Sequence, residues 1–253
     1  MNNRTGDLTR PVWERSCGPQ VRIVLVAPRN PGNIGAACRA IRVCGFDELA
    51  IVDNQLPLDK GTDYAMAWGS LDILEQSLKV DTLEEALVGC HFAIATSARP
   101  RRHERELFTP KELAKKLTEV PMDARVALVF GREDTGLDNE EMERCAWWSR
   151  IPSAAVYPCY NLAQSVQIYC YEMFSAFSEA KEIIEQPLAN PNNIEWLYRR
   201  IREKLEGNGF FPRDGMDEFI NHTRRVLGDV VINEHNTAFL HKLLDGLHGE
   251  RTH

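Results

Sequence analysis

Four polar loops contain the residue types that could bind a ligand or carry out chemistry. They cover residues 28–35, 96–99, 131–137 and 151–161, and each of them follows a short apolar segment. In open α/β sheets, ligands bind beyond the carboxyl ends of the strands. If the apolar segments are parallel strands, these loops therefore form the edge of the sheet at which a site is expected.

The first loop contains a glycine-rich turn, Gly32-Asn33-Ile34-Gly35-Ala36, just before a helical pattern. Such a turn can hold a phosphate group at a helix N-terminus. It lacks the first glycine of the G-x-G-x-x-G dinucleotide fingerprint, and the pattern G-x-x-x-x-G-K-[ST] is absent from the chain. The sequence therefore argues against a Rossmann dehydrogenase and against a P-loop nucleotidase.

Short β-branched runs alternate with helical patterns, which predicts an α/β fold with a parallel sheet flanked by helices. We expect strands at residues 21–26, 49–52, 92–96 and 126–130, with a last short strand at 149–152. The first strand, the helix after it and the second strand span about thirty residues, as in a βαβ unit.

Capping signals predict where the helices begin. Asn33 is expected to cap the first helix and Asp81 a later one. Thr109 and Glu112 have the spacing of a capping box at the start of another helix. A long helix is expected from Asn161, because apolar residues recur there every three or four positions, at Leu162, Val166, Cys170, Met173 and Phe177.

Composition along the chain predicts four parts. Residues 1–19 read as a flexible N-terminal extension, residues 20–178 as one α/β domain and residues 179–193 as a linker. Residues 194–253 contain three helical patterns without strands, near 194–207, 214–227 and 234–247, and are expected to form a small C-terminal helical extension.

The overall composition is that of a globular protein, with 43% hydrophobic and 26% charged residues. No apolar run approaches the roughly 18 residues of a membrane span, and the N-terminus lacks the apolar core of a signal peptide. We therefore expect a cytoplasmic protein that does not bind membranes. The seven cysteines are never spaced as C-x-x-C, which argues against a disulfide framework and a metal site.

Three segments together resemble the motifs of the SpoU class of SPOUT RNA 2′-O-methyltransferases. They are Asn33-Ile34-Gly35-Ala36 followed by Arg39, then residues 128–137 around Gly131-Arg132-Glu133, and finally residues 157–166 around Asn161. They occur in the family's order and at the ends of predicted strands. Within the class, the segment Thr96-Ser97-Ala98-Arg99 and the helical C-terminal extension are most similar to the TrmJ group.

The resemblance implies a C-terminal trefoil knot in the α/β domain, S-adenosylmethionine as the cofactor, and a homodimer. It implies methylation of a tRNA ribose, at a cytidine or uridine in position thirty-two at the start of the anticodon loop. It assigns catalysis to Arg39, either by holding the neighbouring phosphate and stabilising the alkoxide or by acting as a base. The residues that it places around the cofactor are Thr96, Ser97, Ala98, Gly131, Ile151, Pro158, Cys159 and Tyr160.

The third motif departs from the family, because Cys159-Tyr160-Asn161-Leu162 stands where relatives usually read Ser-Leu-Asn-Leu. A thiol is a weaker hydrogen-bonding group than a hydroxyl. Two alternatives to tRNA methylation therefore stay open: methylation of rRNA, and RNA binding by a protein with little turnover. The net charge of −7 opposes general attraction to RNA. A local basic patch could still contact tRNA phosphates, through Arg99, Arg101, Arg102, His103 and Arg105.

Overall fold

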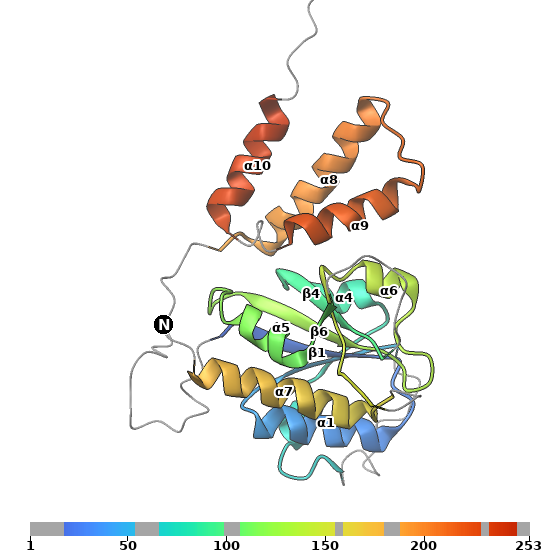
Figure 1. Cartoon of the computed structure of the whole chain (residues 1–253), viewed down its shortest axis with the longest axis vertical. Helices are drawn as coiled ribbons and strands as arrows, with labels where there is room; N and C mark the ends of the chain where they lie inside the picture. Colours follow the sequence, from blue (N-terminus) through green and yellow to red (C-terminus); the bar gives the residue numbers. More distant parts are fainter. Residues whose placement is uncertain are drawn as a thin grey trace, which may run out of the picture.

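A computed structural model describes residues 18–53, 66–98, 107–154, 159–179, 188–228 and 233–246. Seven strands form one sheet in the order β3-β2-β1-β6-β4-β7-β5 (Figure 1). All the strand pairs between these neighbours are parallel. The expected α/β fold with a parallel sheet flanked by helices is therefore confirmed. The strands are β1 (Gln20–Val26), β2 (Glu48–Val52), β3 (Leu78–Val80), β4 (Phe92–Thr96), β5 (Leu107–Phe108), β6 (Arg125–Phe130) and β7 (Trp147–Ser149).

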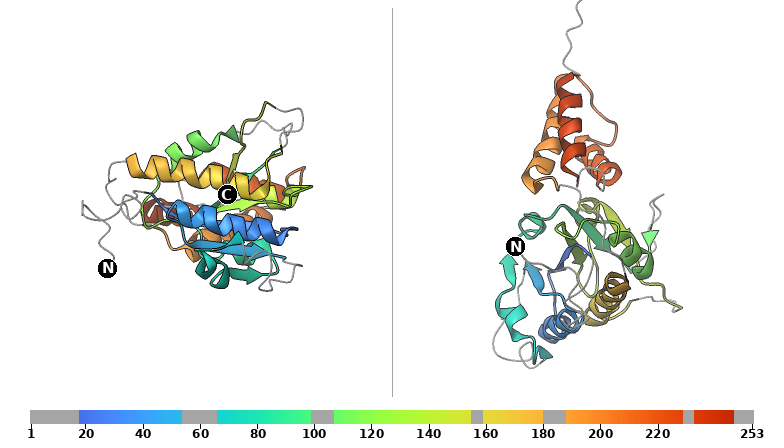
Figure 2. Two further views of the ribbon diagram at one scale, coloured as in Figure 1. Left: turned by 90° about the horizontal axis from the view of Figure 1, so that it is seen from below. Right: turned by 90° about the vertical axis from the view of Figure 1, so that its left-hand side faces the viewer.

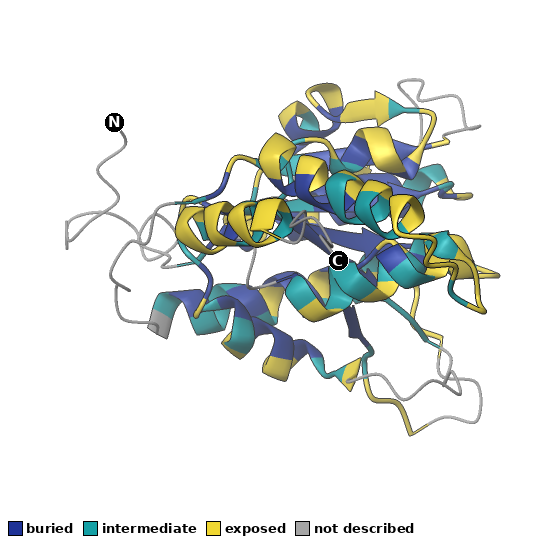
Figure 3. Cartoon of the chain, turned by 90° about the horizontal axis from the view of Figure 1, so that it is seen from above, coloured by how far each residue is buried: buried dark blue, intermediate teal, exposed yellow. Residues whose placement is uncertain are grey.

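The central strands are buried on both faces, which explains their nearly continuous apolar sequences. In β1, Ile23 and Leu25 point into one hydrophobic cluster, whereas Val24 and Val26 point into a second cluster on the opposite face. Figure 3 shows the central strands in the colour of buried residues, inside helices whose outer sides are exposed. The alternation of strand side chains thus divides the core into two layers.

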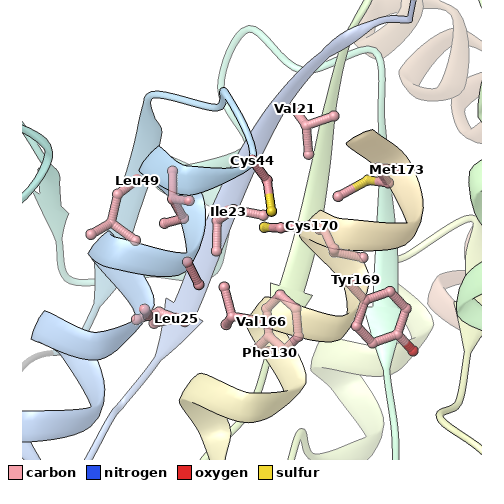
Figure 4. Packing of buried hydrophobic residues seen from close by; sticks show 14 of the residues in the cluster. Val21, Ile23, Leu25, Cys44, Leu49, Phe130, Val166, Tyr169, Cys170 and Met173 are labelled. Atoms are coloured by element: carbon pink, nitrogen blue, oxygen red, sulfur yellow. The ribbon is translucent and has the colours of Figure 1, made fainter. Parts of the chain in front are cut away.

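Helices α1 (Pro31–Val43), α5 (Pro110–Leu117) and α7 (Leu162–Glu179) cover the face of the first cluster. In Figure 4, Val166, Tyr169 and Cys170 of α7 lie against Ile23 of β1 and Phe130 of β6. Both views of Figure 2 show α1 and α7 side by side, and the two helices are in contact. The opposite face is covered by α4 (Leu83–Leu87) and α6 (Asn139–Glu143), and the short α3 (Leu71–Glu75) completes the first face.

Two helix caps differ from those expected from the sequence. Helix α1 is capped by Asn30, whose side-chain oxygen accepts a hydrogen bond from Gly32 N at 2.8 Å, and Pro31 occupies the first helical position. Proline is favoured there because its missing N–H would be unpaired in any case. Helix α4 is capped by Thr82 and not by Asp81, since Thr82 stands three residues before Glu85 and forms a capping box with it.

The other helix and strand boundaries predicted from the sequence agree only in part with the structure. The capping box of Thr109 and Glu112 is confirmed, and the long helix after Asn161 is confirmed as α7. The last strand, expected at 149–152, is β7 at Trp147–Ser149. Pro152 has no N–H to donate to a strand ladder, which accounts for the earlier end. The edge strands β3 and β5 were missed, because three and two residues are too few for a periodic pattern.

The C-terminal helices are α8 (Pro191–Gly207), α9 (Met216–Leu227) and α10 (Glu234–Gly246). Helix α8 begins three residues before the expected position, because Asn190 caps it and Pro191 takes the first helical position. The helices share a small third cluster around Leu197, Tyr198 and Ile220. They stand at one end of the sheet unit in Figure 1.

Helix α9 contacts α6 of the sheet unit through an ion pair between Arg225 and Glu143, whose side chains are 15% and 12% exposed. The backbones also approach closely there, since a Cβ on Gly228 would lie 2.9 Å from Cβ of Ala146. The contact therefore fixes the helical extension beside the turn that leads into β7.

Arg225→Ala should loosen this contact, because it removes a guanidinium that neutralises a largely shielded carboxylate, that of Glu143. Breaking a well-shielded pair costs several kcal/mol, and for this partly solvated one we expect about 2 kcal/mol. Arg202→Ala is the matched control, since its partners Asp217 and Glu206 are 89% and 45% exposed and such pairs contribute less than about 1 kcal/mol each. Hydrogen exchange of the α9 amides measures both, and equal protection in the two variants would contradict the prediction.

Among the described residues, the free cysteines Cys38, Cys44, Cys145 and Cys170 are buried, and Cys159 is exposed. Burial raises the pKa of the Cys170 thiol and raises the pKa of Cys90 to about 11, so these thiols stay protonated. The described part of the chain contains no group of three potential metal ligands. No helix within it is long and apolar enough to cross a membrane.

Candidate active site

Glu133, in the loop after β6, accepts hydrogen bonds from the loop before α1. One carboxylate oxygen accepts from Arg29 N at 2.9 Å, and the other accepts from Asn30 N at 3.2 Å and from Asn33 Nδ2 at 2.9 Å. A carboxylate with three N–H donors binds more strongly than a neutral acceptor would. The first and second motif segments, a hundred residues apart in sequence, are thereby held together.

Asn33 also receives the third motif segment. Asn161 Nδ2 donates to Asn33 Oδ1 at 2.8 Å, and the side-chain oxygen of Asn161 accepts from Ala163 N at 2.9 Å, which caps α7. Asn33 is 8% exposed, and both ends of its amide are hydrogen-bonded. Because Asn30 takes over the cap of α1, the side chain of Asn33 is free to join the three segments.

Glu133 and Asn161 were part of the sequence motifs, but they were not among the site residues expected from the sequence. Both residues lie in the polar loops that follow predicted strands, and this position was the feature that could have identified them. Their partners could not be predicted, because the contacts join segments separated by 100 and 128 residues.

Five of the eight expected cofactor residues lie at the carboxyl ends of three neighbouring strands. Thr96 ends β4, with Ser97 and Ala98 directly after it, Gly131 follows β6, and Ile151 follows β7. These strands are adjacent in the order β6-β4-β7. Two contacts tie their ends together: Thr96 Oγ1 donates to Val129 O at 3.0 Å, and Ser97 N donates to Ser149 O at 3.0 Å.

A buried pair of hydroxyl groups positions the end of β7. Tyr169 Oη of α7 donates to Ser149 Oγ at 2.9 Å, and Ser149 Oγ donates to Phe108 O at 2.8 Å. Burial raises the pKa of Tyr169, so its hydroxyl remains a donor. The segment that leads to Ile151 is thus held by both α7 and β5.

Gly131 stands in a turn that has no room for a side chain. A Cβ at this position would lie 2.2 Å from the carbonyl carbon of Gly136 and 2.2 Å from Leu137 N. The chain folds back here, since Gly136 N donates to Arg132 O at 2.9 Å. The glycine is therefore required by the turn itself, independently of any ligand.

Gly131→Ala should destabilise the protein by about 1–3 kcal/mol, as overpacking of a tight site does. Gly207→Ala is the control, because no atom lies within 4 Å of a Cβ at that helical position and alanine favours helix. Urea unfolding of the two variants measures the difference. A Gly131→Ala protein as stable as the parent would show that the turn can open at little cost.

Arg132, in the same loop, is bound to Glu141 of α6. Its guanidinium donates two hydrogen bonds to Glu141, both at 3.0 Å, and these raise the pKa of Arg132. A cavity of about 440 Å³ lies beside the pair. Its lining residues are Arg29, Arg132, Thr135, Gly136, Leu137, Asp138 and Asn139, so it adjoins the loop after β6 but contains none of the expected cofactor residues.

Arg39, the expected catalytic residue, lies on the exposed side of α1. Within the described ranges, no hydrogen bond or ion pair engages it. Arg42, one turn further along, pairs with Asp72, and this hydrogen bond lowers the pKa of Asp72. The guanidinium of Arg39 is therefore available to a ligand.

Cys159 and Tyr160, the residues that depart from the family motif, are both exposed. The Sγ atom of Cys159 lies 3.7 Å from Glu133 O, and Tyr160 Oη donates to Pro152 O at 3.1 Å. No hydrogen bond joins Cys159 to a histidine within the described ranges. Pro158 and the basic patch at 99–105 lie outside the described residues.

Comparison with known proteins gives consistent matches over most of the chain. The family model described as the SpoU rRNA Methylase family matches residues 20–171. The tRNA (cytidine/uridine/adenosine-2′-O-)-methyltransferase TrmJ of Pseudomonas aeruginosa is 34% identical over 238 residues, covering 89% of this chain and 92% of the relative. The uncharacterized tRNA/rRNA methyltransferase LasT of Escherichia coli is 36% identical over 231 residues, covering 89% and 96%.

A solved structure extends the similarity to three dimensions. The crystal structure of TrmJ from Z. mobilis ZM4 matches with a TM-score of 0.73 and 26% identity. The match covers 90% of this chain and 99% of that one, so it includes the helical extension as well as the sheet unit.

Proposed function

The chain belongs to the SpoU methylase family, and from this premise we propose that it methylates the 2′-hydroxyl of a tRNA ribose with S-adenosylmethionine. Following the TrmJ resemblance, the target is a cytidine or uridine at position thirty-two of the anticodon loop. The observation that carries the proposal is the meeting of the three motif segments at Asn33, through Glu133 and Asn161. Relatives named as tRNA 2′-O-methyltransferases support the substrate.

The donor set fits S-adenosylmethionine. At the neighbouring ends of β4, β6 and β7, Gly131 has no side chain and the side chains of Ser97 and Ala98 are small, so a nucleoside edge can approach the backbone closely. When bound, S-adenosylmethionine supplies an electrophilic methyl group on a sulfonium. The residues proposed to hold it are Thr96, Ser97, Ala98, Gly131, Ile151, Pro158, Cys159 and Tyr160.

Arg39 is proposed to act on the nucleophile. A ribose hydroxyl is a weak acid, so its oxygen needs stabilisation as the O2′ proton leaves. Arginine keeps its proton at ordinary pH, which favours an electrostatic role over that of a base. The guanidinium would hold the phosphate next to the target ribose and stabilise the developing charge on O2′.

The position of Arg39 supports a homodimer. It lies six residues after Asn33 in α1, which is about 9 Å along the helix axis at 1.5 Å per residue. Six residues also turn the helix so that Arg39 leaves it about 120° away from Asn33, and Arg39 is exposed whereas Asn33 is buried. We propose that Arg39 of one protomer completes the site of the other. The trefoil knot in residues 20–178 is likewise proposed from the family resemblance. A cytoplasmic location is proposed from the sequence, because no apolar run in it is long enough to span a membrane.

We assign catalysis and RNA binding to different parts of the chain, with the boundaries expected from the sequence. Residues 20–178 would carry the chemistry, and residues 194–253 would extend the RNA surface beyond the linker at 179–193. The patch at 99–105 would supply phosphate contacts whose strength falls with salt.

One observation favours a second candidate function, methylation of rRNA. The LasT relative is named a tRNA/rRNA methyltransferase, and it is covered to 96% of its length at 36% identity. A third candidate, RNA binding with little turnover, is favoured by the thiol of Cys159 at the position of the family's serine.

Incubation of unmodified tRNA and rRNA transcripts with labelled S-adenosylmethionine separates the three. The modified nucleotide is mapped by mass spectrometry. Methyl on a tRNA ribose supports the proposal, and label only on rRNA supports the second candidate. Binding of cofactor and RNA without label supports the third.

A further inference from the structure

Tyr160 makes a contact that the leucine usual in this family could not make. Its hydroxyl donates to the carbonyl of Pro152 at 3.1 Å, while the ring remains 38% exposed. Because the ring is exposed, burial of its surface contributes little to stability. The contact that distinguishes Tyr160 is therefore the hydrogen bond from its hydroxyl to Pro152 O. The substitution therefore adds a specific hydrogen bond instead of an apolar contact.

The hydrogen bond joins two described segments of the candidate site. Pro152 directly follows Ile151, beyond the carboxyl end of β7. Tyr160 directly precedes Asn161, whose amide is fixed by Asn33 and by the first turn of α7. The carbonyl of Pro152 is thus held relative to the junction of the three motif segments.

The neighbouring Cys159 is held only loosely by comparison. Its Sγ atom lies 3.7 Å from Glu133 O and 3.8 Å from Tyr160 O, which are long contacts for a weak donor. A hydroxyl at that position would bind more strongly. The hydrogen bond of Tyr160 thus supplies, one residue further along, the firm polar contact that Cys159 does not make.

We infer that Tyr160 is a positioning residue for S-adenosylmethionine, acting through its hydroxyl to fix the backbone of Ile151 and Pro152 against the start of α7. The inference rests on the proposed function, since it takes these two segments as parts of the cofactor site. Holding them in the bound arrangement before the cofactor arrives reduces the ordering cost of binding. Affinity for the cofactor, and not the chemical step, is the quantity that depends on it.

Titration calorimetry with S-adenosylmethionine alone tests the inference on the full chain. A net hydrogen bond contributes roughly three- to ten-fold to an equilibrium constant. Tyr160→Phe removes the hydroxyl and keeps the ring, so its Kd should rise by that factor. Tyr160→Leu, the family residue, should bind no better than Tyr160→Phe. In methylation assays, KM for the cofactor should rise while kcat changes less than about two-fold.

Tyr171→Phe is the matched control, because Tyr171 is a 59% exposed tyrosine on α7 whose loss of hydroxyl should change neither Kd nor Tm. A Tyr160→Phe protein with the parent's Kd would overturn the inference, as would a loss of kcat at unchanged Kd. A parent chain that binds no S-adenosylmethionine would overturn the proposed function together with the inference. If the parent binds S-adenosylmethionine and Tyr160→Phe binds it with the same Kd, the inference alone is overturned.

Discussion

Arg39→Ala should lower the rate of ribose methylation by about 100-fold or more, with the fold and the affinity for S-adenosylmethionine unchanged. The loss follows from removing a group that acts on the developing oxyanion, as deletion of one oxyanion donor does in other enzymes. Stability should change by less than ~0.5 kcal/mol, because the side chain is exposed and alanine is a better helix former. Single-turnover methylation, thermal melting and calorimetry measure the three quantities.

Arg42→Ala is the control on the same helix. It loses an exposed ion pair with Asp72, whose side chains are 41% and 54% accessible, and such pairs contribute at most about 1 kcal/mol. The variant should therefore remain active. Normal methylation by Arg39→Ala would refute the catalytic role, whereas unfolding of that variant would show that the residue serves the structure.

Sequence periodicity predicted the parts of this fold that have long apolar patterns. The four main strands and the long helix from Leu162 are where the patterns place them. The helix caps were wrong where two nearby polar residues could each take the role. Thr82 caps α4 in place of Asp81 because it stands three residues before Glu85, and Asn30 caps α1 in place of Asn33 because Pro31 follows it. The position of the neighbouring helical residue decides between such candidates.

The candidate site was predicted as a set of loops but not as a set of contacts. Parallel strands bring their carboxyl ends to one edge, which placed the loops there, whereas the family resemblance supplied Thr96, Gly131 and Ile151. That β4, β6 and β7 are neighbours came from the structure. The role of Asn33 could not be predicted in this way. Because Asn30 caps α1, the side chain of Asn33 is not the helix cap and instead links the motif segments. The same holds for Tyr160, whose partner Pro152 lies eight residues earlier.

Glu133→Ala should have the second large effect, because it removes the acceptor of three hydrogen bonds. Arg29 N, Asn30 N and Asn33 Nδ2 would lose their partner at once. Hydrogen bonds to a charged group contribute about 1.5–3 kcal/mol each, but two of these are solvent-exposed and water can replace them. We therefore expect a net loss of about 2–4 kcal/mol in the free energy of unfolding, measured by urea denaturation.

Methylation should fall further than stability alone explains, because freeing Asn33 Nδ2 also releases the partner that orients Asn161 at the start of α7. Glu133→Gln keeps one acceptor oxygen for Asn33 and should lie between the parent and the alanine variant in both measurements. Asp134→Asn, which alters the neighbouring carboxylate and its exposed pair with Arg29, is the control and should stay close to the parent. If Glu133→Ala and Asp134→Asn behaved alike, the joining of the motif segments would have to rest on backbone contacts, and Glu133 would be one more charge on the surface of the loop.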